Sequence, residues 1–197
     1  NESAARTLEY AYDDWCIYQM GKKLGRPANE TNIYKQRSQN YKNIFHPKYG
    51  MMSGRDSKGN FPENFKPDAW WGPFTEGNSW HWTWCVFHDI RGLINLMGGE
   101  QAFLNKLDAV FTTPPTFGGN VDTRKQLIHE MREMQVVNMG QYAHGNQPIQ
   151  HMIYLYNYAG EPWKAQYWLR EVMERMYSPT PDGYCGDEDN GQTSAWY

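Results

Sequence analysis

The sequence predicts an all-α fold built from helical hairpins. Apolar residues recur every three to four positions along most of the chain, and Gly and Pro interrupt this pattern at intervals. No segment alternates apolar and polar residues convincingly, as a half-buried strand does. Helices joined alternately by short and long loops favour an α/α toroid or solenoid over a compact bundle. The sequence has no recognisable internal repeat, which argues against the solenoid.

The first two helices are expected at about residues 4–24 and 30–45. In the first, Leu8 and Trp15 share one face, and Gly25 follows its end. The second shows the same three-to-four spacing of Ile and Tyr residues. Both segments therefore have the amphipathic pattern of helices that pack on a core.

Residues 46–79 show neither helical nor strand periodicity and contain several Gly and Pro residues. A loop of this length in a compact domain is usually functional. Beyond it, helical periodicity and Gly or Pro stop signals predict further helices at about 80–97, 100–111, 123–134, 148–158 and 161–177.

Composition excludes several classes of protein. The 197 residues suffice for one large domain. A net charge of −3 with scattered Lys and Arg argues against a nucleic-acid partner or an anionic membrane surface. No apolar run approaches the roughly 18 residues of a membrane helix, and there is no signal-peptide pattern. Three widely spaced Cys residues exclude a disulfide framework. The chain starts without Met and stops within a helix-like segment, so we expect it to be part of a longer protein.

Aromatic residues make up 16% of the chain, and nine of them are Trp. Two interpretations remain open. Aromatic faces stack on flat apolar ligands such as sugar rings, and they also fill cores.

Three adjacent carboxylates, Asp187, Glu188 and Asp189, lie between two glycines near the end of the chain. They do not form an EF-hand loop, because that loop needs Gly at its sixth position and Gln192 stands there. A looser calcium site, a general base and a solvated acidic turn all remain possible.

Glu76 lies in "FTEGNSWHWTW" (74–84), among four aromatic residues and just before a helix. A carboxyl group packed against aromatic rings loses solvation, which raises its pKa and suits it to act as a general acid. The alternative is that Glu76 caps the helix at Asn78 or Ser79.

"HEMRE" (129–133) places His129, Glu130 and Glu133 near one helical face. It is not the zinc-protease HExxH motif, because Glu133 occupies the position of the second His. Carboxylates three residues apart suit calcium better than zinc. An ordinary amphipathic helix with surface charges is the alternative.

"GQYAHGNQPIQH" (140–151) is rich in neutral hydrogen-bonding side chains, including His144 and Gln147. Such groups suit ligand hydroxyls, although a lone His is usually structural. The sequence has no phosphate-binding glycine loop, no GxSxG motif and no recognisable Cys/His nucleophile pair.

Six segments of the chain, in this order, resemble glycoside hydrolase family 92, the calcium-dependent, inverting exo-α-mannosidases. These segments are "RTLEYAYDDWCI", "RSQNYKNIF", "FTEGNSWHWTW", "FHDIRGLINLMGG", "GQYAHGNQPIQHMIYLYNYAGEPWK" and "GDEDNGQTSAWY". The resemblance implies a β-sandwich domain followed by an (α/α)6 toroid. Residues 1–197 would be roughly the second half of that toroid, a fragment of one catalytic domain without the sandwich or the C-terminal tail.

The resemblance also implies roles for individual residues. Inverting hydrolysis uses a carboxylic acid and a carboxylate base about 6.5–9.5 Å apart. Glu76 corresponds to the acid, and Asp187 or Asp189 to the base. Glu130, Glu133 and Asp189 are the expected calcium ligands. The expected substrate contacts are Arg37, Asn40, Trp80, His129, Glu130, His144 and Gln147.

The expected partners are α-mannoside glycans, for example the α-1,2-linked mannose of N-glycans or mannan. Because Glu76 is present, ordinary α-mannosides are favoured over mannosyl phosphodiesters, whose leaving group departs without protonation. Some family members carry Glu where Gln147 stands, so an essential acid is not expected there. The alternatives are a phosphodiester hydrolase and a calcium-dependent mannose-binding module without catalysis. By the same resemblance, the protein is expected to be secreted, periplasmic or attached to a bacterial cell surface.

Overall fold

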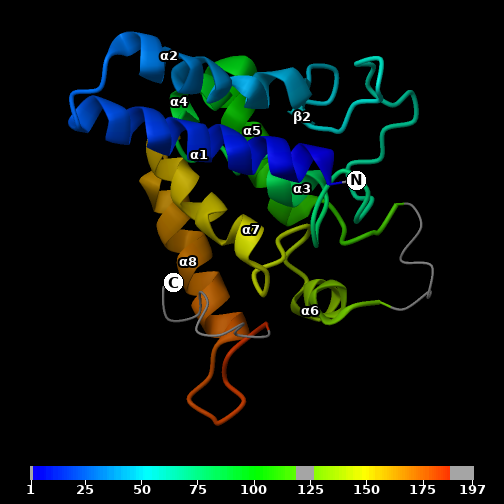
Figure 1. The fold of residues 1–197 in the computed structure, drawn as a ribbon. Helices are drawn as coiled ribbons and strands as arrows, with labels where there is room; N and C mark the ends of the chain where they lie inside the picture. The colour runs from blue at the N-terminus through cyan, green and yellow to red at the C-terminus, as the bar shows by residue number, and fades with distance from the viewer. Residues whose placement is uncertain (1, 119–126, 187–197) are drawn as a thin grey trace.

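The computed structural model describes residues 2–118 and 127–186, and the regular secondary structure of these residues is almost entirely helical (Figure 1). The strands of this part are β1 (Phe45–His46) and β2 (Met51–Met52), two residues each. The all-α prediction is therefore confirmed.

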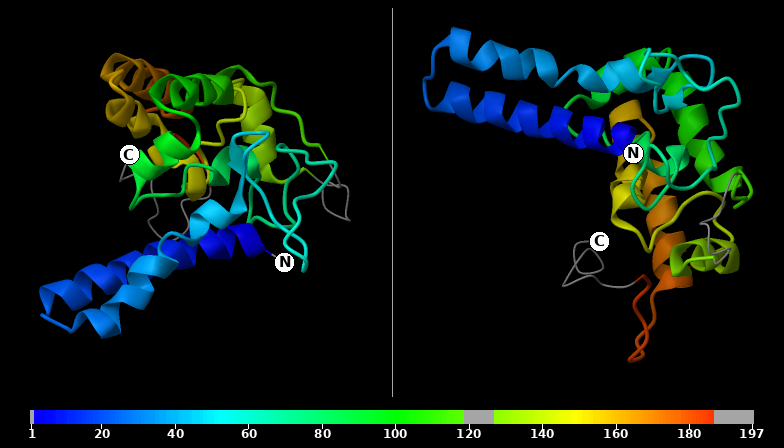
Figure 2. Two further views of the ribbon diagram at one scale, coloured as in Figure 1. Left: turned by 90° about the horizontal axis from the view of Figure 1, so that it is seen from above. Right: turned by 45° about the vertical axis from the view of Figure 1, so that its right-hand side comes forward.

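The N-terminal helices α1 (Ser3–Lys23) and α2 (Ala28–Arg37) form an antiparallel hairpin that projects from the rest of the molecule (Figures 1 and 2). Gly25 makes the turn with φ +67°. Arg37 on α2 pairs with the buried carboxylate of Asp14 on α1, with Nε and Oδ2 3.0 Å apart. The first helix agrees with its prediction, whereas the second ends eight residues early and is followed by a 3-10 helix, η1 (Asn40–Ile44).

The long loop predicted at 46–79 is confirmed in most of its length. It also contains half of a short antiparallel hairpin, in which Phe45 pairs with Met52 and His46 with Met51. The sequence analysis missed this hairpin, because two-residue strands are too short to show alternation.

The single helix predicted at 80–97 is wrong. The structure has α3 (Ser79–Trp82) and α4 (Ile90–Leu96), separated by turns. A new helix begins because the Asp89 side chain accepts a hydrogen bond from Gly92 N as its N-cap. Asp89 is held in this position by the hydroxyl of Tyr41, which donates to its Oδ2 at 2.7 Å.

The 3-10 helix η2 (His151–Ala159) contacts α4, α5 (Glu100–Thr112), α7 (Gln147–Gln150) and α8 (Pro162–Met176). At its centre the buried Tyr156 hydroxyl donates to Asp108 on α5 at 2.8 Å. Phe111 on α5 stacks on Trp168 of α8, with ring centroids 3.6 Å apart. The helix predicted at 123–134 corresponds to α6, which begins at His129 among the described residues. Residues 123–126 lie outside the described part. The bounds of α6 are His129–Val137.

The core accounts for many of the aromatic residues. Trp70, Trp80, Trp82 and Trp84 are all buried in one continuous cluster. In contrast, Trp163 on α8 is 59% exposed. The interpretation of a Trp-rich core is therefore correct for these four residues. No helix among the described residues is long and apolar enough to span a membrane.

Candidate active site around Glu76

Residues 71–77, which we call the strap, form the last part of the long loop before α3 and carry Glu76. Two strap residues other than glycine have left-handed backbone conformations, Trp71 with φ +70° and Glu76 with φ +42°. Such conformations cost about 1–3 kcal/mol each and persist when the surroundings hold them. The groups that hold the strap are therefore part of the site.

The N-terminus of α1 holds the first half of the strap. Glu2 N donates to Gly72 O at 2.7 Å, and Ala4 N and Ala5 N donate to Pro73 O at 2.9 and 3.1 Å. Backbone N–H groups in the first turn of a helix have no partner within the helix. The strap carbonyls supply these partners, so α1 and the strap fix each other.

Two side chains hold the second half of the strap. The indole Nε1 of Trp82 on α3 donates to Thr75 O at 2.8 Å. The buried Asn146 donates from Nδ2 to Glu76 O at 2.6 Å. The backbone of Glu76 is thus positioned by a residue 70 positions later in the chain.

The Glu76 residue itself is exposed and lines a cavity of about 320 Å³. The expectation that aromatic rings bury it is wrong, because Glu76 stays exposed although Trp82 and Phe87 line the same cavity. Glu76 is also not a helix cap. Asn78 caps α3 by accepting from Trp80 N at 2.9 Å. The other lining residues of the cavity are Glu9, Thr75, Trp82, Cys85, Phe87, Asn146, Gln147 and Pro148.

Glu9 on α1 places a second carboxyl group in this cavity, and the sequence analysis did not identify it. Partial burial raises the pKa of Glu9, and the nearby charge of Asp13 raises it further. In the sequence Glu9 has the pattern of a surface residue on an amphipathic helix. Its raised pKa is the kind of property that accompanies functional carboxyl groups.

The polar segment 140–151 serves mainly to hold the fold together. Gln141 is buried and makes three side-chain hydrogen bonds, to Asn78, Pro114 and Thr116. His144 is also buried, between the hydroxyls of Tyr142 and Tyr177 at 2.9 and 2.8 Å. Of this segment, Asn146, Gln147 and Pro148 line the cavity beside Glu76.

Glu133, predicted as a calcium ligand, contacts Gly186, the residue that precedes the acidic segment. Its Oε2 accepts a hydrogen bond from Gly186 N at 2.9 Å. A Cβ on Gly145 would lie 2.2 Å from the Glu133 Oε1, and a Cβ on Gly186 would lie 2.5 Å from the Gly145 oxygen. Three remote segments therefore approach closely. Only glycine fits at Gly186, which meets backbone atoms of Gly145, whereas a Cβ on Gly145 would displace the Glu133 carboxylate. Asp187 follows Gly186 directly, but Asp187 and Asp189 lie outside the described residues.

On α6, Glu130 is buried and His129 is exposed. The His129 Nε2 lies 3.2 Å from the Glu130 Oε1. Within residues 2–118 and 127–186, no three His, Cys, Asp or Glu side chains gather as a metal-binding group. The calcium-ligand prediction for Glu130, Glu133 and Asp189 stays a prediction.

The other predicted substrate contacts do not line the cavity beside Glu76. Arg37 is engaged with Asp14, as described above. Asn40 begins η1 and accepts a hydrogen bond from Asn43 at 3.4 Å. Trp80 is 7% exposed, and its ring lies beneath the ammonium group of Lys106.

Comparison with known proteins assigns a family. The whole chain, residues 1–197, matches the family model described as the glycosyl hydrolase family 92 catalytic domain. Two solved structures from Bacteroides thetaiotaomicron superpose on all of it. A family GH92 inverting mannosidase is 54% identical with a TM-score of 0.80. A family GH92 α-mannosidase in complex with mannoimidazole is 39% identical with a TM-score of 0.83.

A curated relative from the fungus Arthroderma benhamiae, described as an uncharacterized secreted glycosidase, is 27% identical over 96% of the chain. The chain covers 26% and 25% of the two bacterial structures and 24% of the fungal protein. It therefore spans about a quarter of the length of these relatives.

Three buried histidines give a prediction for stability against pH. Burial lowers the pKa of His81 to about 3 and the pKa values of His144 and His151 to about 4. The unfolded chain binds these protons near pH 6.5. Above pH 6.5 these histidines should therefore not reduce the unfolding free energy. As the pH falls from 6.5 toward 4, the unfolding free energy should decrease by about 1.4 kcal/mol per pH unit for each histidine.

Urea unfolding between pH 4 and 8 measures this dependence. In His151→Gln, the amide can replace the hydrogen bond from His151 Nε2 to Trp84 O. Below pH 6.5, we expect the slope of the unfolding free energy against pH to correspond to one proton fewer in this variant than in the parent protein. An unfolding free energy independent of pH between 4 and 6.5 in the parent protein would contradict the assignment.

Proposed function

This chain belongs to glycosyl hydrolase family 92, and on that premise we propose that the protein containing it is an inverting, calcium-dependent exo-α-mannosidase. The observation that supports this most directly is the arrangement of one loop, residues 144–147. Asn146 holds the backbone of Glu76, and Gly145 contacts both Glu133 and Gly186. The loop thus connects the proposed acid with the residue that precedes the proposed base.

In the proposed reaction Glu76 protonates the glycosidic oxygen while the bond from that oxygen to the mannose C1 breaks. Asp187 or Asp189 removes a proton from a water molecule, which attacks C1 from the opposite face. This division of roles inverts the configuration at C1. The two carboxyl groups need different environments, since one must begin protonated and the other ionised.

The exposure of Glu76 in this chain is compatible with the acid role. The chain spans a quarter of its relatives, and the rest of the catalytic domain would have to supply the low-polarity surroundings that favour a protonated carboxyl group. Glu9, whose pKa is raised by partial burial and by Asp13, adds a further carboxyl group beside Glu76.

The residues proposed to hold calcium are Glu130, Glu133 and Asp189, because carboxylate oxygens are the ligands this ion prefers. Glu133 fits this role best among the described residues, since it lies directly against the peptide preceding Asp187. When bound, calcium would act as a Lewis acid toward sugar hydroxyls. Residues 187–197 would have to complete its ligand set.

Gln147 and His129 are our proposed contacts for substrate hydroxyls. Gln147 lines the cavity beside Glu76, and His129 is exposed next to Glu130. The other expected substrate contacts do not line this cavity, so they would have to contact the substrate outside it. These residues are Arg37, Asn40, Trp80 and His144. We also propose that the parent protein is exported, since the fungal relative is described as secreted.

Mannose release from α-1,2-, α-1,3-, α-1,4- and α-1,6-linked mannobioses by the full-length protein tests the proposal. We expect release with calcium present and its loss after treatment with a chelator, with activity restored when calcium is added back. Mannose binding without release in either condition would contradict the enzyme and favour a binding module. Release that persists in chelator would remove the calcium requirement.

The acid role of Glu76 has its own test. In the full-length protein, Glu76→Gln should lower kcat/KM for a mannobiose by a factor of about 100 to 10,000, because the sugar leaving group departs without a proton. Turnover of α-mannosyl fluoride should change by only a few-fold, since fluoride needs little protonation. Steady-state kinetics on both substrates measures the difference.

The matched control is Glu63→Gln, which removes an exposed carboxyl group of the same long loop outside the cavity. This substitution should leave kcat/KM for the mannobiose and the turnover of α-mannosyl fluoride unchanged. Equal losses on mannobiose and fluoride in Glu76→Gln would show a general defect and would contradict an acid at this position.

A further inference from the structure

Residues 177–186, which we call the base arm, lead from the end of α8 toward the proposed base. The arm projects from the rest of the molecule (Figures 1 and 2). Within it, Ser178 N donates to Gly183 O and Gly183 N donates to Thr180 O, both at 3.0 Å. Asp187 follows the arm directly in the sequence. Contacts that fix the end of the arm therefore fix the point from which the acidic segment continues.

Both ends of the base arm are attached to consecutive residues of the 144–147 loop. At the first end, the Tyr177 hydroxyl lies 2.8 Å from His144 Nε2. At the second end, a Cβ on Gly186 would lie 2.5 Å from the backbone oxygen of Gly145. Compact surface loops whose two ends lie close together frequently carry functional groups. His144 and Gly145 thus hold the two ends of the arm next to each other.

His144 is itself rigidly held. Its side chain is fully buried, and its Nδ1 lies 2.9 Å from the hydroxyl of Tyr142, which is buried beside Phe111. Gln150 Nε2 donates to the backbone oxygen of His144 at 2.8 Å. Burial lowers the pKa of His144 to about 4, so the ring is neutral near pH 7 and has one donor and one acceptor nitrogen. A tyrosine hydroxyl can donate or accept, so the two hydroxyls satisfy both nitrogens.

The same loop connects the base arm to the proposed acid. Gly186 N donates to Glu133 Oε2 at 2.9 Å, and Asn146 Nδ2 donates to Glu76 O at 2.6 Å. Because consecutive Cα atoms are about 3.8 Å apart, the Cα atoms of His144 and Asn146 lie within about 7.6 Å of each other. An inverting glycosidase must hold its two carboxyl groups at a separation that admits a water molecule. This short stretch of the loop is suited to set that separation.

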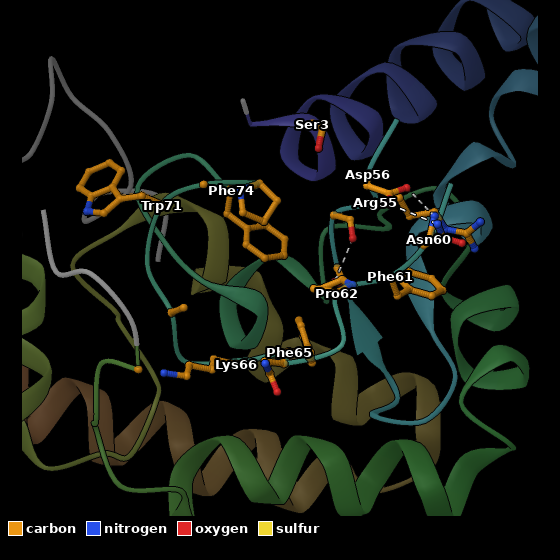
Figure 3. Close-up of a pocket in the computed structure, with 17 residues that line it drawn as sticks. Ser3, Arg55, Asp56, Asn60, Phe61, Pro62, Phe65, Lys66, Trp71 and Phe74 are labelled. Carbon is orange, nitrogen blue, oxygen red and sulfur yellow. Dashed lines mark hydrogen bonds between the residues drawn. The ribbon is translucent and has the colours of Figure 1, made fainter. Parts of the chain in front are cut away.

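The strap has further supports that do not involve the base arm. The backbone N–H groups of α1 and the indole of Trp82 hold its other carbonyl oxygens. Its first half, with Trp71 and Phe74, lines a separate cavity whose wall includes the first turn of α1 (Figure 3). A change at Tyr177 should therefore move the arm and leave Glu76 in place. Defects of the base and of the acid can thus be distinguished by experiment.

We infer that the hydrogen bond between His144 and Tyr177 positions the proposed base, Asp187 or Asp189, by fixing the arm that precedes it. The inference rests on the proposed function, because it takes the acidic segment as the source of the base. His144 is then a positioning residue. This role differs from the substrate contact that the sequence predicts for it.

The test is Tyr177→Phe in the full-length protein, which removes the hydroxyl group and keeps the aromatic ring. A displaced base should lower kcat about 10- to 100-fold for a mannobiose and for α-mannosyl fluoride, because in both reactions the attacking water must lose a proton. Steady-state kinetics on the two substrates measures these losses.

Azide distinguishes a displaced base from a general defect. Azide is an anion that forms its bond to C1 without losing a proton, while the C–F bond breaks and fluoride leaves. Adding azide should therefore raise fluoride release by Tyr177→Phe about tenfold or more, with β-mannosyl azide as the product. A protein that is merely misfolded gains nothing from azide.

Two further variants complete the test. Tyr184→Phe removes a hydroxyl group from an exposed tyrosine of the same arm and should keep the kinetics of the parent protein. Gly186→Ala disturbs the other end of the arm, because its Cβ would meet the backbone of Gly145. It should show the same losses as Tyr177→Phe and the same response to azide.

Losses on both substrates, with fluoride release restored by azide, support the inference. A loss that azide does not reverse, a loss confined to the mannobiose, or parent-like kinetics overturns it and leaves the mannosidase intact. If Tyr177→Phe does not fold, Gly186→Ala decides by the same criteria. If the full-length parent protein hydrolyses neither substrate, the proposed function fails and the inference fails with it.

Discussion

The structure around Glu76 depends on the hydrogen bonds that the strap carbonyls accept from other elements. The carbonyl oxygens of Gly72 and Pro73 accept hydrogen bonds from backbone N–H groups at the start of α1. The carbonyl oxygen of Thr75 accepts one from the Trp82 indole, and that of Glu76 accepts one from the Asn146 side-chain amide. A seven-residue segment with two left-handed residues has little stability of its own. Its conformation therefore depends on tertiary contacts with α1, α3 and the 144–147 loop.

The same 144–147 loop makes the second connection of the site. Gly145 lies against the Glu133 carboxylate and the backbone of Gly186, so α6, the loop and the segment leading to Asp187 are fixed relative to one another. The cavity beside Glu76 is lined by Thr75 and Glu76 of the strap, and a second cavity, of about 520 Å³, is lined by Trp71, Gly72, Pro73 and Phe74.

The sequence predicted what depends on local pattern. The periodicity of α1 and α8, and the position of the long loop, could be predicted because amphipathic spacing and Gly or Pro breaks act within a few residues. The break between α3 and α4 could not, since it depends on Tyr41 reaching Asp89 from 48 residues away. The burial of His144 and the exposure of Glu76 also depend on remote partners. Glu9 was missed because its pattern is that of any surface residue of a helix.

The central claim is that Asn146 positions Glu76 as the acid, and Asn146→Ala in the full-length protein tests it most directly. A misplaced catalytic group can cost up to about 100-fold in rate, so kcat for a mannobiose should fall about 10- to 100-fold. Turnover of α-mannosyl fluoride should be nearly unchanged, since it needs little help from the acid. Equal losses on both substrates, or no loss on either, would contradict the account.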